Sequence, residues 1–350
     1  MTDTLNVALI GYGYAGKTFH APLINSVTGL HLSAVCSSNA EKVAADYPSV
    51  KVFASTDELF AQAQIDVIVI ATPNHTHFDL AKRALLADKH VVVDKPFTIT
   101  EAQARELTAL AEQKGLVLSV FHNRRWDADF LTVRALINSR KLGELTSFES
   151  RFDRYRPEVK LRWREQAGEG SGLWYDLGPH LLDQALQLFG RPNAIQANFA
   201  LQRANAQVID YFDVFLRYPQ LNISLHASML MAHESPRFVL TGSAGSYKKF
   251  GLDTQEDALK RGELPGCDKW GHDPRNGEVQ MTQDNSSVSI KNLVGDYRHF
   301  YSAFRDAVLL KTANPVLPND AVLVMALIEL AAESAKLGRE IILPSRFVIT

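Results

Sequence analysis

A six-residue glycine motif near the start constrains the fold of this chain more than any other feature. Gly11-Tyr12-Gly13-Tyr14-Ala15-Gly16 follows the apolar run Asn6–Ile10 and precedes a helical stretch. In such a unit the first glycine permits a tight turn, the second lets a pyrophosphate approach the backbone, and the third lets the helix pack on the strand. The helix N-terminus favours an anion. The motif predicts that Gly11, Tyr12, Gly13, Tyr14, Ala15 and Gly16 bind a dinucleotide; the alternative is a glycine turn without a ligand.

Short apolar runs alternate with helical segments over the first 121 residues. The runs are Asn6–Ile10, Leu30–Cys36, Val50–Phe53, Asp66–Ala71, His90–Val93 and Leu116–Phe121. Parallel strands are nearly continuously apolar because both of their faces are buried. A capping box at Thr100 starts one helix, and Gly115 ends it. The pattern predicts an α/β protein whose N-terminal Rossmann domain, residues 1–121, has a doubly wound parallel sheet.

The pattern changes after residue 121. Longer and more mixed strand-like runs follow: Ser147–Arg154, Ala194–Gln202, Val208–Tyr218 and Leu221–Met229. They predict a second, α+β domain over residues 122–350 with a large open antiparallel sheet. We expect helices around Gly178–Phe189 and from Asp320 to Leu337, the latter capped by Asn319 and ended by Gly338. Thr254–Val279 is rich in glycine, proline and charge, and we expect a long loop there.

Charge and cysteine content exclude several functions. There are 37 lysines and arginines against 39 acidic residues, so no general nucleic-acid partner is expected. No apolar run approaches a membrane span, and the first four residues lack a signal peptide, so we expect a cytoplasmic protein without a membrane partner. Cys36 and Cys267 lie far apart in the sequence, so we expect two reduced thiols. The histidines show no spacing that is typical of metal ligands, so we expect no metal site.

The end of the second strand bears on the choice of cofactor. The sequence there is Val35-Cys36-Ser37-Ser38-Asn39, with no acid before Glu41. A carboxylate at this point would bind the ribose 2′-hydroxyl of NAD and repel the 2′-phosphate of NADP. Ser37 and Ser38 suit a phosphate, and Lys42 supplies a positive charge. The segment therefore favours NADP over NAD; alternatively, the two serines only cap the next helix.

Two further segments carry candidate catalytic groups. Asp94-Lys95-Pro96 follows the fifth strand, at the sheet edge where ligands bind in such folds, and its X-Pro bond is a candidate for the cis form. Asp176, His180 and Asp183 are spaced by four and three residues, which places them on one helix face. Histidine exchanges protons near neutral pH, and a neighbouring carboxylate orients it. The alternatives are a surface lysine and a structural histidine.

These motifs together resemble the family of glucose–fructose oxidoreductases and inositol dehydrogenases, over essentially the whole chain. The resemblance is carried by Gly11–Gly16, Ala71-Thr72-Pro73 with His77, Asp94-Lys95-Pro96 and Asp176–His180. Three longer strings resemble the branch of the family that oxidises scyllo-inositol with NADP. They are Asn123-Arg124-Arg125-Trp126-Asp127, Phe152-Asp153-Arg154-Tyr155-Arg156-Pro157-Glu158 and Arg162-Trp163-Arg164-Glu165. Many members have glutamate at the position of Asp94, and NADP-using members often have arginine at that of Asn39.

The resemblance implies roles for individual residues. Lys95 contacts the reacting oxygen, Asp176 binds the substrate and the lysine, and His180 exchanges the hydroxyl proton. Cofactor contacts are expected from Thr72, Pro73, Asn74, His77, Asp94, Lys95, Asn123 and Arg124. Substrate contacts are expected from Lys95, Asn123, Trp126, Tyr155, Trp163, Asp176 and His180, although core packing is the alternative for the aromatic residues. The resemblance also implies that the open sheet forms the interface of a homodimer or homotetramer.

The leading hypothesis is a reversible, NADP-dependent oxidation of a cyclitol secondary hydroxyl, with scyllo-inositol as substrate. One alternative is the same chemistry on an aldose or deoxysugar. Another is a non-catalytic regulatory protein that senses NADP.

Overall fold

The fold of this computed structural model, which describes residues 4–344, divides into two compact units. Unit 1 comprises Met1–Trp126, Thr254–Gly271 and Asp296–Val322. Unit 2 comprises Asp127–Asp253, His272–Gly295 and Leu323–Thr350. We expected two continuous domains that meet between residues 121 and 122. The observed units differ from this division, because two later segments of the chain return to unit 1.

Unit 1 is built on a parallel six-stranded sheet, as expected. The strands are β1 (Leu5–Ile10), β2 (Leu30–Cys36), β3 (Lys51–Phe53), β4 (Val67–Ile70), β5 (His90–Val93) and β6 (Leu118–Val120). Their order is β3-β2-β1-β4-β5-β6, and every neighbouring pair is parallel. The strand order reverses between β1 and β4, and the carboxyl ends of strands at such a point are where ligands bind in open α/β sheets.

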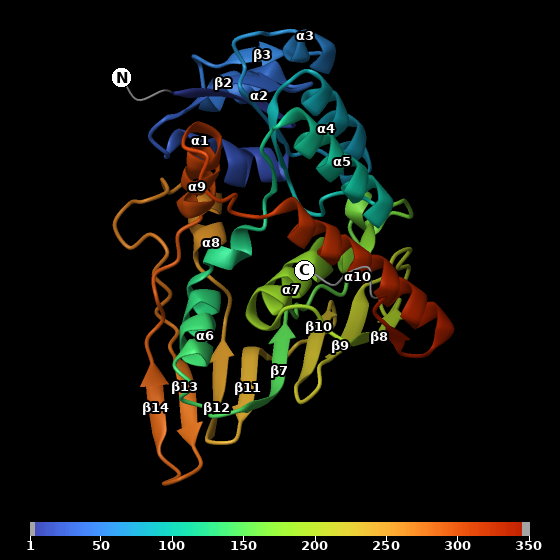
Figure 1. Ribbon diagram of the computed structural model, residues 1–350, viewed down its shortest axis with the longest axis vertical. Helices are drawn as coiled ribbons and strands as arrows, with labels where there is room; N and C mark the ends of the chain where they lie inside the picture. Colours follow the sequence, from blue (N-terminus) through green and yellow to red (C-terminus); the bar gives the residue numbers. More distant parts are fainter. Residues whose placement is uncertain (1–3, 345–350) are drawn as a thin grey trace. The chain divides into compact units, whose positions relative to one another are not determined.

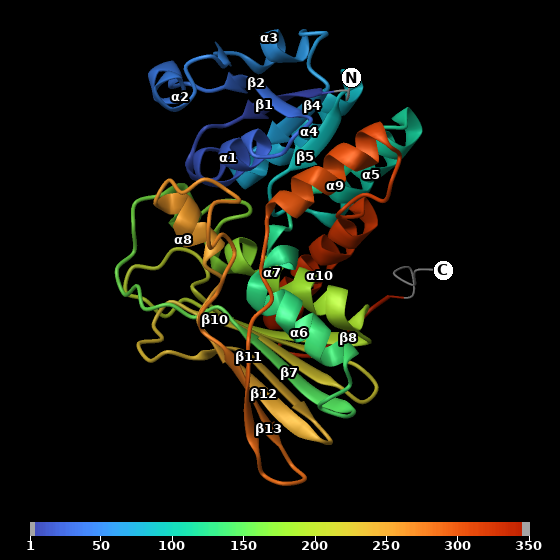
Figure 2. The same cartoon turned by 90° about the vertical axis from the view of Figure 1, so that its left-hand side faces the viewer.

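Short helices connect and cover the strands of unit 1. They are η1 (Gly16–His20), α1 (Ala21–Asn25), α2 (Ala40–Asp46), α3 (Thr56–Phe60), η2 (Asn74–Thr76), α4 (His77–Leu86), α5 (Glu101–Lys114), η3 (Asn123–Trp126), α8 (Gln255–Lys260) and α9 (Arg298–Leu309). The capping box of Thr100 and the left-handed Gly115, with a φ of 65°, delimit α5 as expected. α9 packs beside α1, and α8 contacts η1 (Figures 1 and 2).

The expectation of one long loop over Thr254–Val279 was wrong. The segment contains α8 and the start of strand β13 (Gly277–Met281). Gln255 ties α8 down, because its side chain donates to the Trp126 carbonyl at 3.1 Å and accepts from the Tyr297 N–H at 2.7 Å. These bonds join positions more than forty residues apart, so local sequence gives no sign of them.

Unit 2 contains a nine-stranded sheet. The strands are β7 (Leu145–Arg151), β8 (Ala194–Ala200), β9 (Tyr211–Arg217), β10 (Asn222–Ser228), β11 (Pro236–Gly242), β12 (Gly245–Phe250), β13, β14 (Ser287–Ile290) and β15 (Ile341–Ile342). Their order is β14-β13-β12-β11-β7-β10-β9-β8-β15. The sheet is mostly antiparallel, as expected, but β7 and β10 pair in parallel, so it is mixed.

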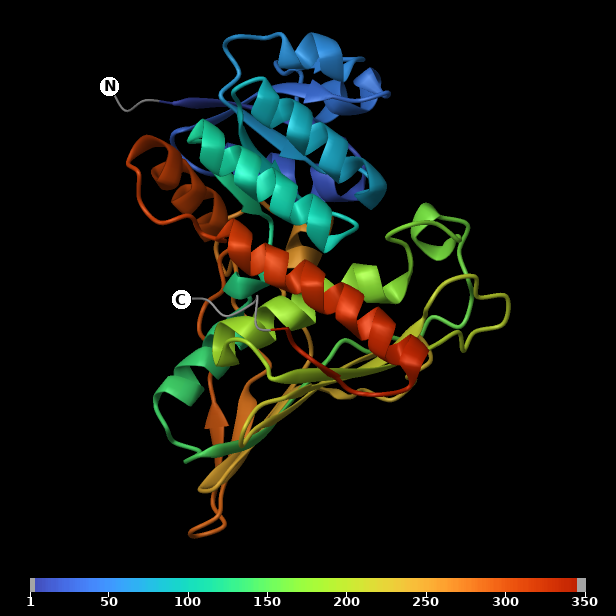
Figure 3. The ribbon, with the colours of Figure 1, turned by 45° about the vertical axis from the view of Figure 1, so that its right-hand side comes forward.

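The helices of unit 2 are α6 (Ala128–Asn138), η4 (Trp163–Glu165) and α7 (Gly172–Phe189), while α10 (Pro318–Leu337) runs from unit 1 into unit 2. Two of these helices, α7 and α10, were expected from the sequence, and both begin earlier than expected. α7 packs on β9 and β10 (Figure 3). We expected a start near Gly178 for α7, but Gly178 lies inside the helix, where a Cβ would come within 2.6 Å of the Trp174 ring. Asn319 likewise lies inside α10 rather than capping it, and Gly338 follows the end of the helix with a φ of 62°.

Four charged side chains form a buried cluster in unit 2. The Lys249 ammonium lies 2.8 Å from Asp273, and both side chains are at most 1% exposed. The Arg237 guanidinium lies 4.0 Å from Asp129, and these side chains are at most 2% exposed. Burial raises the pKa of Asp129, although Arg237 and Lys249 oppose the shift. Two cations and two carboxyl groups therefore share one water-poor space.

Within residues 4–344, no helix has the length and apolar character to cross a membrane.

Candidate functional site

The glycine loop of unit 1 has the shape that a dinucleotide requires. Gly11 has a φ of 96°, and a Cβ there would lie 2.6 Å from the Ala71 carbonyl oxygen. A Cβ on Gly16 would lie 2.0 Å from the Gly11 oxygen, so both glycines are required by close packing. A Cβ on Gly13 would meet no atom within 4 Å. The middle glycine thus borders open space at the start of a helix, which fits the approach of a pyrophosphate.

Lys42 lies beside this loop. Its ammonium donates to the Tyr12 carbonyl oxygen at 3.1 Å and stands 5.7 Å from the centre of the Tyr12 ring. Asp46, one turn further along the same helix α2, accepts from the Tyr12 hydroxyl at 2.8 Å and from Lys17 at 2.6 Å. Burial and the Asp46 carboxylate raise the pKa of Tyr12. The sequence argument identified Lys42 but missed Lys17, which directly follows the loop, and Asp46, which the fold brings to the loop.

The serines after β2 do not cap the next helix. Asn39 is the N-cap of α2, because its side chain accepts from the Lys42 backbone N–H at 2.9 Å. Ser37 accepts from the Asn39 N–H at 3.1 Å and is partly exposed, and Ser38 is exposed. The capping alternative was therefore wrong, and no carboxylate stands between β2 and the start of α2.

An acidic residue that the sequence argument missed binds two of the predicted cofactor residues. Glu256 of α8 accepts from the Tyr14 hydroxyl at 2.8 Å, from Arg124 at 2.8 Å and from Lys260 at 3.0 Å. Burial alone would raise the pKa of Glu256, but these three donors outweigh it and lower the pKa to about 2. Glu256 is therefore an anion at neutral pH and holds α8 against the glycine loop.

The Lys95 turn stands on a buried network. The Lys95–Pro96 peptide bond is cis, as the sequence suggested. The Asp94 carboxylate accepts from the Lys95 N–H at 2.8 Å and lies 3.8 Å from the His20 ring. The other His20 ring nitrogen lies 2.6 Å from the Tyr301 hydroxyl. Burial alone would raise the pKa of Asp94, but His20 and the Lys95 charge outweigh it and lower the pKa. Asp94 is thus an anion beneath Lys95.

His77 joins two loops of the predicted site. Its ring nitrogens lie 2.8 Å from the Pro96 oxygen and 3.0 Å from the Thr72 oxygen, and the residue is fully buried. Burial lowers its pKa. The His77 side chain thus positions the two loops, and its contact with the cofactor stays a prediction. Thr72 and Pro73 are partly exposed, whereas Asn74 and Asn123 are buried.

The remaining predicted site residues lie in unit 2, apart from Trp126. Asp176 and His180 are one turn apart on α7, with His180 6% exposed. α7 begins at Gly172, before the expected start near Gly178, so Asp176 lies within the helix. Asp176 lies 3.8 Å from Arg164, and its side chain is 25% exposed.

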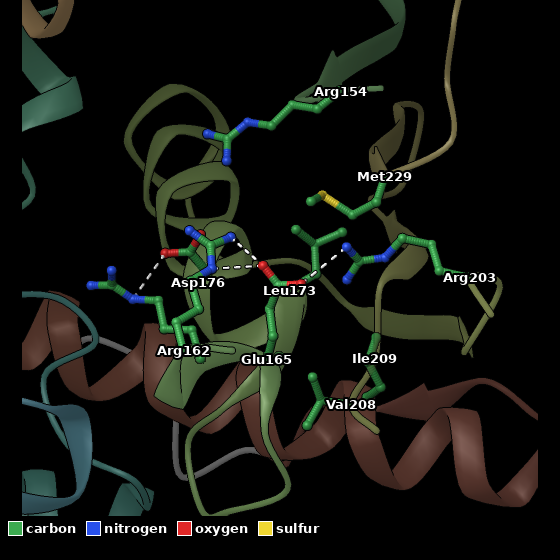
Figure 4. Close-up of a pocket in the computed structure, with 11 residues that line it drawn as sticks. Arg154, Arg162, Glu165, Leu173, Asp176, Arg203, Val208, Ile209 and Met229 are labelled. Carbon is green, nitrogen blue, oxygen red and sulfur yellow. Dashed lines mark hydrogen bonds and ion pairs between the residues drawn. The ribbon is translucent and has the colours of Figure 1, made fainter. Parts of the chain in front are cut away.

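A pocket in unit 2 opens onto Asp176 (Figure 4). Arg164 also lines it and stacks on the Trp163 ring at 4.9 Å. Tyr155 is 60% exposed and pairs with Leu230 through one bridge of extended backbone. In unit 1, Trp126 is partly exposed and packs edge-on against Phe300.

Unit 1 has the form of a dinucleotide-binding domain: a parallel doubly wound sheet with a glycine loop at the reversal of strand order. Comparison with known families agrees. Residues 5–122 match the NAD-binding Rossmann fold of an oxidoreductase family, and residues 134–343 match its C-terminal alpha/beta domain. The chain belongs to the Gfo/Idh/MocA oxidoreductase family.

Several relatives match along almost their full length. The oxidoreductase YdgJ of Escherichia coli, named as uncharacterized, is 54% identical over 96% of this chain and 98% of its own. IolW of Bacillus subtilis, named scyllo-inositol 2-dehydrogenase (NADP(+)), is 37% identical over 97% of this chain and 96% of its own. Among solved structures, the Yersinia pestis protein YPO2259 is 49% identical, with a TM-score of 0.95 over 99% of both chains.

Proposed function

We propose that this protein is an NADP-dependent dehydrogenase that reversibly oxidises a secondary hydroxyl of a cyclitol, with scyllo-inositol as the leading candidate substrate. The observation that carries the proposal is the combination of an open glycine loop with a lysine turn in unit 1 and an aspartate–histidine pair in unit 2. The name of IolW supports the choice of substrate. Oxidation of an aldose or deoxysugar would use the same groups.

NADP would bind at the glycine loop, with its 2′-phosphate near Ser37, Ser38 and Lys42. Support comes from the exposed Lys42 ammonium at the loop and from the absence of a carboxylate between β2 and α2. The nearest acid of the loop, Asp46, is already engaged by Tyr12 and Lys17. The bound nicotinamide supplies or accepts the hydride.

The side chains handle the proton and the developing charge. Lys95 stabilises the alkoxide that forms as the hydroxyl loses its proton, an electrostatic effect that is strongest where water is excluded. His180 takes up that proton in oxidation and returns it in reduction. Asp176 hydrogen-bonds the substrate. Asp94, tied to His20 and Tyr301, holds the Lys95 turn in place.

We also propose that the protein works as a homodimer or homotetramer in the cytoplasm. Phe215 on β9 is 49% exposed, and a second copy of the sheet would cover such a residue.

The test is an absorbance assay of the reduced nicotinamide with NADP and NAD against a panel of inositols, aldoses and deoxysugars. Activity with scyllo-inositol and NADP is expected. Lys95→Ala and His180→Ala should each lower kcat/KM by about a hundredfold or more while NADPH still binds. Lys141→Ala and His31→Ala alter exposed residues and serve as controls. No turnover of any polyol, or full activity of both site variants, would refute the assignment.

A further inference from the structure

The turn of α7 that carries Asp176 and His180 is held only in part by its own backbone. Pro179 lies inside the helix, directly before His180. A proline has no N–H, so it cannot donate the helical hydrogen bond to the carbonyl of Tyr175, four residues earlier. Gly178 lies in the same turn, and glycine adds backbone freedom within a helix. Contacts from outside the helix are therefore needed to fix this turn.

The side chain of Gln184 makes such a contact. Gln184 lies one turn after His180 on the same face of α7, since residues four apart on a helix are neighbours. Its side-chain oxygen accepts from the Arg237 guanidinium at 2.6 Å. Gln184 is fully buried, and Arg237 is 2% exposed. A hydrogen bond with a charged donor is strong, so this bond ties α7 to strand β11.

Arg237 has a fixed place in unit 2. A β-bulge lies at this residue, where the pairing of β11 with β12 shifts by one position, and bulges re-aim side chains. The guanidinium donates to the Ser150 hydroxyl at 2.5 Å and to the Arg151 carbonyl at 3.3 Å. It also stacks on the Phe238 ring, 4.1 Å from the ring centre. The sheet therefore holds Arg237, and Arg237 holds Gln184.

We propose that Gln184 and Arg237 are positioning residues for the reaction: they fix the turn of α7 from which His180 exchanges the proton. The inference rests on the proposed dehydrogenase function, which gives His180 this role. Proton transfer requires the imidazole within hydrogen-bond reach of the substrate hydroxyl. A displacement of about 1 Å can cost about a hundredfold in rate, so a bond one turn away from His180 affects kcat without touching the substrate.

The first test is Gln184→Met, which keeps the length of the side chain and removes the oxygen that Arg237 binds. In the assay described above, kcat should fall about tenfold or more. The KM for NADP should stay the same, since the cofactor is assigned to the glycine loop of unit 1. Gln184→Glu keeps an acceptor for Arg237 and should retain most of the wild-type kcat. Gln187→Met is the matched control, because Gln187 is exposed on the same helix, and it should leave kcat unchanged.

A double variant shows whether the two residues act through one bond. Arg237→Lys keeps a positive charge beside Asp129 but cannot make all the bonds of the guanidinium, so kcat should fall here too. When it is combined with Gln184→Met, kcat should be close to that of the slower single variant, because two changes that break the same contact are not additive. Urea unfolding checks that each variant is folded. If Arg237→Lys does not fold, the comparison of Gln184→Met with Gln184→Glu carries the test alone.

Three results would overturn the positioning roles. They are a wild-type kcat in Gln184→Met, an equal loss in Gln184→Glu and Gln184→Met, and losses that multiply independently in the double variant.

NMR of protein with labelled histidines separates this inference from the proposed function. The ring signal of His180, identified by its absence in His180→Ala, should move in Gln184→Met, return towards its wild-type position in Gln184→Glu and stay in place in Gln187→Met. If no polyol is oxidised but the signal behaves in this way, the dehydrogenase assignment fails and the positioning roles stand. If a polyol is oxidised and Gln184→Met changes neither kcat nor the signal, the positioning roles fail and the dehydrogenase assignment stands.

Discussion

The buried charge cluster of unit 2 makes a quantitative prediction for Lys249→Met. Methionine preserves most of the side-chain volume but removes the ammonium that lies 2.8 Å from Asp273. The cluster then holds Arg237 against two carboxyl groups, all of them at most 2% exposed. Removing one partner of a buried pair leaves an uncompensated charge, and the expected loss in the free energy of unfolding is about 3–5 kcal/mol.

A double variant separates charge from packing. Asp273→Asn keeps the side-chain oxygen that accepts the Arg275 N–H at 2.9 Å while it removes the negative charge. Combined with Lys249→Met, it restores a neutral cluster, so the double variant should lie within about 1–2 kcal/mol of the wild type. Lys248→Met is the control, because Lys248 is the exposed neighbour on β12, and its cost should be below about 0.5 kcal/mol.

Urea unfolding followed by tryptophan fluorescence measures these differences, since Trp174 is 1% exposed within unit 2. The pH dependence is a second readout. Asp129 already has a raised pKa in the folded state, and loss of the Lys249 charge raises it further. A raised carboxyl pKa favours folding at pH values below the pKa of the unfolded chain, and this contribution is lost as pH rises through the folded value. The deficit of Lys249→Met should therefore shrink as the pH falls from 7 towards 5.

A loss below about 1 kcal/mol for Lys249→Met would refute the reasoning, since a buried charge without its partner costs more than that. A double variant as unstable as the single one would also refute it, because the defect would then come from packing.

Three further variants test unit 1. In steady-state assays, Lys42→Glu should raise the KM for NADP by a factor about tenfold or more larger than the factor for NAD, as expected for a charge beside the 2′-phosphate. Equal changes in the two KM values would show that Lys42 does not contact the 2′-phosphate. Glu256→Gln should weaken NADPH binding and lower unfolding stability by about 1–3 kcal/mol at neutral pH, because Arg124, 8% exposed, loses its charged partner. The pKa of Glu256 is about 2 in the folded protein, so its contribution to the free energy of unfolding is still complete at pH 5. The contribution decreases at pH values below the pKa of an unfolded glutamate and is lost near pH 2. A stability difference between Glu256→Gln and the wild type that is already gone at pH 5 would contradict this assignment. Tyr301→Phe deprives the buried His20 ring of its hydroxyl partner and should lower the free energy of unfolding in urea by about 1–3 kcal/mol. The same variant should change kcat by a larger factor than it changes the KM for NADP.

Local sequence determined the elements that depend on neighbouring residues. Apolar runs predicted all six parallel strands of unit 1, and the capping box of Thr100 with the αL glycine at 115 predicted both ends of α5. The glycine loop was predicted because its three glycines stand in one strand–turn–helix unit, although Gly11 is also required by its close approach to Ala71. Apolar runs, caps and motif spacings are properties of short segments, so they can be read from the sequence.

The tertiary structure alone decided how distant residues serve the site. It brought Glu256 to Tyr14, 242 positions away, and Tyr301 to His20, 281 positions away. It made His77 a buried link between two loops, and it gathered the arginines of the unit 2 pocket from separate segments. Ion pairs and hydrogen bonds of this kind depend on where chain segments meet after folding, and no spacing within a segment encodes that meeting.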